Sequence, residues 1–320
     1  MIFALCVVVF TFATGFVYRR AWIRLRGLGV TPSGFGVLLS FVLLGAAVVA
    51  NVSFELLVSL IVIVITSIVY WLDDVIELSA RIRILISFVA GVAITSALLG
   101  WNGTYALLPV LGISFVVGFT NVAFTNIVNF YDGADLNLAT FVILSAGFVL
   151  VFSPVHSEWM PIAVTCLAFM VPFAVMNSRP NTIYLGDSGS FVFASVLTVM
   201  VVSFLKDIHS IAPEAAIPVA LPAFDVFFVL LIRIKEKHDL LARNYLHLYQ
   251  RLNRRYSGFG YLLPQVGNTV ICLVFAIVLQ ASGLGRGLSV ILAMSIVTIP
   301  FYFVCRCLFL DKQAEVGPRI

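Results

Sequence analysis

The sequence has few charged residues and no cysteine pattern that would hold a small fold together. Only 11% of its 320 residues are charged, whereas 62% are hydrophobic, well above the roughly 45–50% of a typical water-soluble domain. The five cysteines form no C-x-x-C pair, which argues against a zinc knuckle and a disulfide framework. We therefore exclude a secreted domain, a peripheral protein and a disordered chain, and expect an integral membrane protein.

Hydrophobic segments long enough to cross a bilayer recur along the chain. A spanning helix needs about 20 mostly apolar residues, and apolar runs that approach this length predict helices at residues 1–17, 35–50, 55–72, 84–100, 105–124, 138–153, 160–176, 190–205, 212–232, 262–282 and 288–310. The first run lacks a preceding cationic segment, so we expect a retained span and not a signal peptide. No linker interrupts the series. The sequence predicts an all-α, polytopic membrane protein with about 11 transmembrane helices and a single domain, residues 1–320.

The distribution of basic residues predicts the orientation of these helices. An odd number of spans places the termini on opposite sides of the membrane. If the N-terminus is outside, 17 of the 19 Lys and Arg residues fall in inner segments, and only Lys206 and Arg286 lie outside. Because cytoplasmic loops are enriched in basic residues, we predict a multi-pass protein of the inner (plasma) membrane with an outer N-terminus and a cytoplasmic C-terminus.

Acidic residues gather at the predicted cytoplasmic ends of three helices. A carboxylate near the bilayer core costs about 2.5–3.5 kcal/mol on insertion scales, so this convergence calls for a functional reason. Glu77 and Asp225 lie nearby, and the simplest interpretation of Glu77 is a side chain that reaches water. Of the five carboxylates at these helix ends, Asp73 and Asp74 lie at the end of the third predicted helix. The other three lie just after the fifth and seventh: Asp132, Asp135 and Asp187.

The segment Gly186-Asp187-Ser188-Gly189-Ser190 predicts a phosphate and magnesium site. These small residues open a helix, so backbone N–H groups can face an anion while the aspartate faces a cation. Asn126, Asn129, Asp132 and Asp135 add amides and carboxylates three residues apart, a spacing that lines one side of a helical turn. Such oxygen ligands suit Mg²⁺, which is usually held by one or two carboxylates and by the phosphates of a substrate.

The longest predicted inner loop, residues 233–258, carries seven Lys and Arg residues together with His238 and His247. Such a loop can bind anionic lipid headgroups or close over the phosphates of a substrate. The segment His247-Leu-Tyr-Gln-Arg251-Leu is more particular than orientation alone requires, and it favours a phosphate clamp. We therefore expect a cytoplasmic site at which phosphoryl groups pass between a soluble substrate and a lipid.

At these motifs the sequence resembles the polyprenyl-phosphate N-acetylhexosamine-1-phosphate transferases of glycosyltransferase family 4, whose relatives include the phospho-MurNAc-pentapeptide translocase. The resemblance covers nearly the whole chain. It implies transfer of an N-acetylhexosamine 1-phosphate, or of a 6-deoxy N-acetyl sugar 1-phosphate, from a UDP-sugar to undecaprenyl phosphate with release of UMP. This reaction starts O-antigen, lipopolysaccharide and other cell-envelope polysaccharides. The similar segments are Thr31–Gly36, Asp73–Asp74 with Leu78–Arg83, Asn126–Asp135, Asn177–Ser190 and His247–Leu252.

The resemblance also implies a role for each matching residue. Arg83 would hold the acceptor phosphate, and Asp135 would contact the uracil. The implied ligands of Mg²⁺, or of Mn²⁺ in its place, are Asn129 and Asp187. The implied catalytic residues are Asp73, Asp74, Arg83, His247 and Arg251. The implied substrate-binding residues are Asn126, Asp132, Asp135, Gly186 and Ser188.

The chain departs from the family pattern, and two other functions stay open. Leu136 stands where the family has a glycine, Asn244 stands where a first histidine is expected, and the loop after the first helix is short. A catalytically inactive homologue is therefore one alternative, and a secondary transporter or lipid flippase that uses the acids as a cation path is the other. The expected partners are a UDP-N-acetyl sugar, undecaprenyl phosphate and membrane lipid, without nucleic acid. Large apolar faces are compatible with a homodimer.

Overall fold

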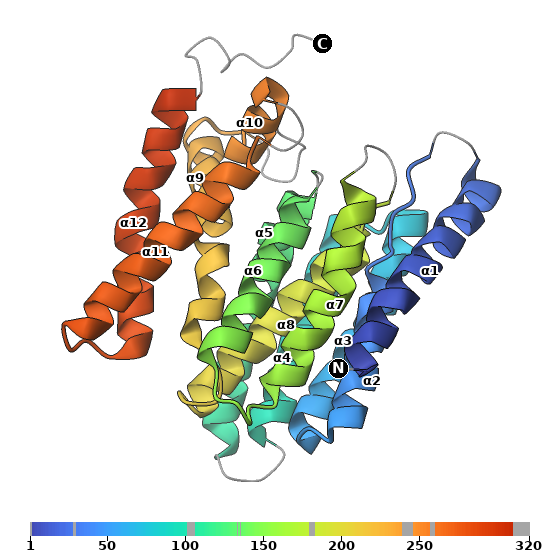
Figure 1. Ribbon diagram of the computed structural model, residues 1–320, viewed down its shortest axis with the longest axis horizontal. Helices are drawn as coiled ribbons and strands as arrows, with labels where there is room; N and C mark the ends of the chain where they lie inside the picture. The colour runs from blue at the N-terminus through green and yellow to red at the C-terminus, as the bar shows by residue number, and fades with distance from the viewer. Residues whose placement is uncertain are drawn as a thin grey trace.

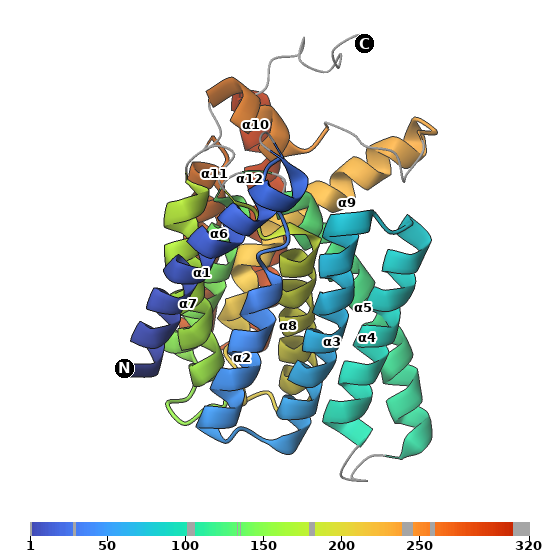
Figure 2. The same ribbon diagram turned by 90° about the vertical axis from the view of Figure 1, so that its right-hand side faces the viewer.

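The computed structural model describes residues 2–27, 30–100, 106–132, 134, 136–178, 183–238, 246–256 and 260–309. Within these residues every regular element is helical: α1 (Ile2–Arg26), α2 (Val37–Ala50), α3 (Phe54–Ile76), α4 (Ala80–Gly100), α5 (Leu107–Asp132), α6 (Asn137–Phe152), α7 (Trp159–Asn177), α8 (Gly186–Lys206), the 3₁₀ helix η1 (Pro213–Val219), α9 (Ala220–Lys235), α10 (Leu248–Tyr256), α11 (Leu262–Ala281) and α12 (Arg286–Phe309). The long helices run side by side and their connections alternate between two ends of a bundle (Figures 1 and 2).

The length and the apolar composition of its helices identify the described part of the chain as a polytopic membrane protein. Nine helical segments, counting η1 and α9 as one, are long and apolar enough to cross a membrane. The apolar helices α2 and α6 have 14 and 16 residues. At 1.5 Å per residue they measure about 21 and 24 Å, less than the roughly 30 Å of bilayer hydrocarbon. The predicted all-α membrane fold is confirmed, whereas eleven crossings, a single domain and the orientation of the termini stay predictions.

The predicted helices end too early at the polar end of the bundle. Asp73 and Asp74 lie in the last turn of α3, and Asp132 is the last residue of α5. The prediction that Asp73 and Asp74 lie at the end of the third helix is confirmed. The prediction that Asp132 follows the fifth helix is wrong, because backbone hydrogen bonding continues beyond the apolar run from which the span is recognised. The basic loop 233–258 also contains a helix, α10, that its polar composition hides. Leu248, Tyr249 and Leu252 form the buried face of α10.

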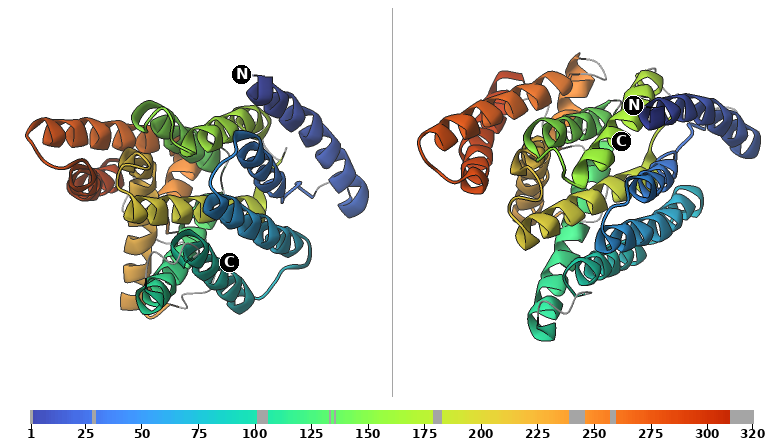
Figure 3. Two further views of the ribbon diagram at one scale, coloured as in Figure 1. Left: turned by 90° about the horizontal axis from the view of Figure 1, so that it is seen from below. Right: turned by 60° about the horizontal axis from the view of Figure 1, so that its bottom comes forward.

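Helix α8 lies at the centre of the bundle and determines where the functional end can form. Most residues of its apolar stretch are buried. The helix contacts α2, α3, α4 and α5. The helix α1 and the pair α11–α12 lie at opposite edges (Figures 1 and 3). Gly36 and Gly189 allow the starts of α2 and α8 to approach closely, because a Cβ atom on Gly36 would collide with the Cα and N atoms of Gly189. The first residues of α8 are therefore enclosed by neighbouring helices.

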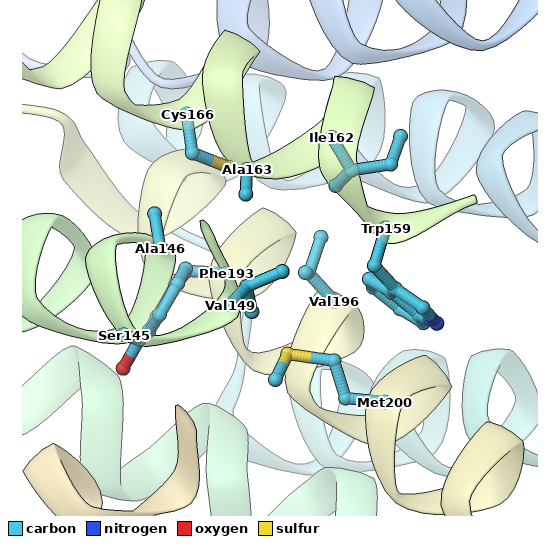
Figure 4. A pocket seen from close by; sticks show the side chains of 10 residues that line it. All are labelled: Ser145, Ala146, Val149, Trp159, Ile162, Ala163, Cys166, Phe193, Val196 and Met200. Atoms are coloured by element: carbon cyan, nitrogen blue, oxygen red, sulfur yellow. The ribbon is translucent and has the colours of Figure 1, made fainter. Parts of the chain in front are cut away.

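Polar side chains inside the bundle fix α8 relative to its neighbours. Asn121 on α5 donates to the backbone oxygen of Ser87 on α4 at 2.7 Å, and its Oδ1 accepts from Thr198 on α8 at 2.8 Å. Interhelical hydrogen bonds of this kind contribute on average about 0.6 kcal/mol each in membrane helices. On another side of α8, a small apolar cavity of about 20 Å³ lies between α6, α7 and α8 (Figure 4). This volume is on the order of one water molecule, so we assign that region to packing.

Candidate active site

A cavity of about 350 Å³ opens beside the N-terminal end of α8, and three carboxylates line it. We call it the acidic cavity. The segment before α2 and the helices α3, α5 and α8 all contribute to its wall. The lining residues are Ser33, Asp74, Asn129, Asp132, Tyr184, Gly186 and Asp187. The structure therefore brings together acids that lie more than one hundred residues apart, as the sequence predicts.

Two extended segments hold the wall of this cavity in place. The backbone N–H of Tyr184 donates to the oxygen of Pro32 at 2.8 Å, and the N–H of Gly36 donates to the oxygen of Leu185 at 2.9 Å. Gly186 follows with φ = +75°, a region that residues with a Cβ atom rarely adopt. A Cβ atom there would also collide with the carboxylate of Asp74. A glycine is required at 186 for both reasons.

Asp74 caps α8 from a neighbouring helix. Its Oδ1 accepts hydrogen bonds from the hydroxyl of Ser33 at 2.9 Å and from the backbone N–H of Asp187 at 3.0 Å. Its Oδ2 accepts from the N–H of Ser188 at 3.2 Å. A carboxylate at this place is stabilised by the first N–H groups of the helix and by the helix dipole. The anion that these two N–H groups meet is therefore Asp74, and not a bound phosphate as the sequence suggests.

The carboxylate of Asp187 lies between an amide and a guanidinium. The side-chain nitrogen of Asn129 donates to its Oδ1, and Nη1 of Arg83 donates to its Oδ2 at 3.1 Å. The same Arg83 nitrogen lies 3.5 Å from Oδ2 of Asp73. Asp73 is almost fully buried and accepts a hydrogen bond from the backbone N–H of Leu78 at 2.5 Å. Asp73 therefore closes the α3–α4 turn and holds Arg83, and it does not line the cavity.

The chemistry of the lining fits Mg²⁺ shared with a substrate. Within the described residues no three His, Cys, Asp or Glu side chains are grouped closely enough to hold a metal by themselves. Mg²⁺, however, is usually bound by one or two carboxylates, by water and by substrate phosphates. Asp74, Asp132 and Asp187 place three like charges around one open volume, and a divalent cation there would reduce their mutual repulsion.

Two further predicted residues, Asn126 and Ser188, do not present a side chain to the cavity, and a third, Asp135, lies outside the described part of the chain. Asn126 is exposed, and its amide donates to the backbone of Val122 at 2.9 Å. The hydroxyl of Ser188 is buried and turns back to the oxygen of Leu185 at 3.3 Å, so Ser188 contributes through its backbone. Asp135 is outside the described residues, as is Asn244, and the predictions for them stay predictions.

His247 and Arg251 are buried beside the cavity and do not line it. The imidazole of His247 is 1% exposed and its ring centre lies 5.1 Å from that of Phe130, which follows Asn129 on α5. Arg251 is 9% exposed on the first turns of α10. The basic segment therefore packs against α5 at Phe130, the residue that follows the cavity-lining Asn129.

Two lining residues of the cavity, and the role of Asp225, were not predicted from the sequence, although the sequence places Asp225 near this end. Ser33 and Tyr184 line the cavity, although both belong to segments that the motifs mark. Asp225 is fully buried and anchors α10. The available signal for Asp225 was an acidic residue inside an otherwise apolar span, which indicates a special environment.

Comparisons with known proteins show which proteins the chain resembles. Residues 56–205 match the model of the family Glycosyl transferase family 4. The chain is 27% identical over 250 residues to a probable undecaprenyl-phosphate N-acetylglucosaminyl 1-phosphate transferase of Bacillus subtilis (strain 168), covering 70% of this chain and 66% of that protein. It is 28% identical over 193 residues to a phospho-N-acetylmuramoyl-pentapeptide-transferase of Wolbachia pipientis wMel, covering 52% and 58%. The matches thus span less than two thirds of either relative's length.

Proposed function

Residues 56–205 belong to glycosyl transferase family 4, and from this premise we propose that the chain transfers a sugar 1-phosphate from a nucleotide sugar to polyprenyl phosphate. The donor is a UDP-N-acetylhexosamine or a 6-deoxy N-acetyl relative, and the acceptor is undecaprenyl phosphate. The printed name of the Bacillus relative contains the same acceptor, which supports this choice. The product lipid starts an O-antigen or another cell-envelope polysaccharide, and UMP is released.

The observation that carries the proposal is the acidic cavity at the ends of apolar helices. A soluble nucleotide sugar can enter this cavity from water, while the phosphate of a lipid can approach from the adjacent bilayer. The enrichment of basic residues in the segments at this end supports a cytoplasmic location, because cytoplasmic loops carry an excess of Lys and Arg. A transporter, in contrast, places its ionisable groups near the middle of the membrane.

The residues of the cavity divide into distinct roles in this reaction. Asp187 and Asn129 are the proposed ligands of Mg²⁺ or Mn²⁺, and a bound divalent ion offsets the negative charge that develops on the diphosphate. Arg83 lies beside Asp187 with a side chain 41% exposed, which suits it to holding the acceptor phosphate. Asp74 fixes the backbone that carries Asp187, and Asp132 faces the donor from α5.

The reaction is an in-line displacement at phosphorus. An oxygen of the acceptor phosphate forms a bond to the sugar-bearing phosphorus of the donor, and the bond from that phosphorus to the oxygen of UMP breaks. The acceptor phosphate is ionised near neutral pH, so the attacking oxygen carries no proton that must first be removed. The protein contributes by aligning two anionic groups that would otherwise repel each other.

UMP release by the purified protein tests the proposal. Wild-type protein in detergent is given undecaprenyl phosphate, Mg²⁺ and in turn UDP-GlcNAc, UDP-GalNAc and 6-deoxy N-acetyl donors. We expect UMP release with one of these donors, loss with excess EDTA, and recovery with Mg²⁺ or Mn²⁺. Asp187→Asn should lower the rate about 10³-fold, the scale of losing one central electrostatic contact. The matched control is Asp207→Asn, an exposed aspartate at the other end of α8, which should leave the rate unchanged.

Three results would contradict the proposal or its residue assignments. Binding of UDP-sugar without any UMP release would indicate an inactive homologue. Movement of a lipid or an ion across vesicles without UMP release would indicate a transporter. Full activity of Asp187→Asn would remove this residue from the catalytic centre.

A further inference from the structure

Asp225 occupies a closed polar centre next to the acidic cavity. The side chain is fully buried within an apolar stretch of α9. Its Oδ1 accepts from the hydroxyl of Tyr302 on α12 at 2.9 Å, and its Oδ2 accepts from the hydroxyl of Tyr131 on α5 at 3.0 Å. The backbone N–H of Leu248, the first residue of α10, lies 3.0 and 3.1 Å from the two oxygens. We call Asp225, Tyr131, Tyr302 and Leu248 the Asp225 hub.

The hub connects the basic segment to the wall of the cavity. Through Leu248, Asp225 caps the start of α10, the helix that carries Arg251. Through Tyr131 it reaches the residue directly before Asp132, which lines the cavity. A single carboxylate thus fixes α10 relative to α5, because hydrogen bonds to a charged acceptor contribute about 1.5–3 kcal/mol each.

The hub also sets the position of His247. Nδ1 of His247 lies 3.3 Å from Oδ2 of Asp225, and the imidazole ring is placed between the rings of Phe130 and Tyr249 at centroid distances of 5.1 and 5.9 Å. This contact places the imidazole beside the carboxylate without a hydrogen bond between them. Among the described residues neither ring nitrogen of His247 has a hydrogen-bond partner, although both are buried.

A buried polar atom without a partner costs about 1–3 kcal/mol, so the imidazole gains free energy from any partner that supplies what the described residues do not. Tyr249 packs against two residues of this region, with ring centres 4.8 Å from Tyr131 and 5.9 Å from His247. Burial raises the pKa of the Tyr249 phenol above its usual range, and the negative charges of Asp225 and Asp132 raise it further. Tyr249 therefore stays a neutral phenol while it lies near a carboxylate of the hub and one of the cavity.

We propose that Asp225 is a positioning residue of the transferase: it holds α10 so that His247 addresses the diphosphate of the donor. This proposal rests on the proposed function. Asp225 itself is enclosed by its hydrogen-bond donors and touches neither substrate. Its contribution to catalysis therefore passes through His247.

A double-mutant cycle tests this assignment. UMP release is measured for wild type, Asp225→Asn, His247→Ala and the double variant. Asp225→Asn should lower kcat about 10- to 100-fold, the range seen when an orienting partner is lost, with KM for the UDP-sugar changed less than about 3-fold. In the His247→Ala background the same substitution should change kcat less than about 2-fold, because residues that act as a unit are not additive. Asp225→Glu should recover part of the rate.

The control is a second buried carboxylate far from the cavity. Glu214 in η1 is 2% exposed and pairs with Arg286 at 2.8 Å. Glu214→Gln should lower the melting temperature and leave kcat per folded protein unchanged. If Asp225→Asn does not fold, Tyr131→Phe enters the cycle, since it removes only the hydroxyl that shares Oδ2 with His247.

The outcomes separate the two proposals. Wild-type protein that releases no UMP contradicts the transferase function and leaves the hub without a reaction to serve. Active wild type with an Asp225→Asn rate within about 3-fold, or with effects of Asp225→Asn and His247→Ala that multiply, overturns the positioning role alone. Non-additive loss with a nearly constant KM supports it.

Discussion

The acidic cavity and the Asp225 hub place carboxylates at the same end of one bundle in opposite ways. The cavity gathers Asp74, Asp132 and Asp187 around an open volume of about 350 Å³. The hub encloses a single carboxylate with donors from three other helices. Like charges around an open volume destabilise one another, whereas Asp225 is fully buried among its hydrogen-bond donors.

The difference separates carboxylates that share an open volume from a carboxylate that is enclosed. Asp74 and Asp187 have partners within the protein, but three acids around one cavity still gain electrostatic energy from a cation, and such sites are frequent in catalytic centres. A saturated buried carboxylate gains nothing from a cation, but it fixes helices that would otherwise move independently. The two regions should therefore respond differently to packing changes, to Mg²⁺ and to loss of a single oxygen.

The largest expected effect comes from closing the gap between α2 and α8. Gly36→Ala forces a Cβ atom into the backbone of Gly189, and overpacking against backbone should cost about 3 kcal/mol or more. We expect a lower melting temperature and loss of UMP release, because the start of α8 moves. Gly45→Ala is the control, since this site in the same helix has nothing within 4 Å of the added atom. Equal behaviour of both variants would contradict the close contact.

Mg²⁺ should stabilise the cavity and leave the hub unaffected. At a hundredfold excess over its dissociation constant, a ligand stabilises the folded state by about 2.7 kcal/mol. Thermal unfolding with and without MgCl₂ should show an increase in melting temperature for wild type and for Asp225→Asn. The increase should disappear in Asp187→Asn. A response that survives in Asp187→Asn, or that vanishes in Asp225→Asn, would place the ion elsewhere.

The sequence was sufficient to predict the long apolar helices and the convergence of the acids, because a helix that crosses a bilayer needs an apolar run with polar ends. It did not predict α10 or the last turns of α3 and α5. It was not sufficient for the partner of each acid. That Asp74 caps α8 and that Asp73 turns toward Leu78 depends on how helices cross, which no local pattern records. The hub was missed for the same reason, since its four residues come from four helices.

Asp74 offers a smaller and more local test of the cavity. Asp74→Ala removes the acceptor for the N–H groups of Asp187 and Ser188, and loss of a helix cap costs about 0.5–2 kcal/mol. Asp74→Asn keeps one acceptor oxygen and should cost less. Unfolding in denaturant should therefore rank wild type, Asn and Ala in decreasing stability. If the Asn variant is as unstable as the Ala variant, Asp74 stabilises the fold through its charge and not through capping of α8.

The smallest expected effect concerns the position at which the chain departs from its family. Leu136 has φ = +63°, and its N–H donates to Oδ1 of Asn177 at 2.6 Å, so the backbone is held in a left-handed conformation. That conformation costs an L-residue about 1–2 kcal/mol, and glycine avoids the cost but loses more chain entropy on folding. Leu136→Gly should therefore be more stable than Leu136→Ala by at most about 1 kcal/mol, measured by thermal unfolding. Because both variants remove the same apolar side chain, their difference isolates the backbone conformation, and a more stable Ala variant would show that position 136 does not retain this geometry.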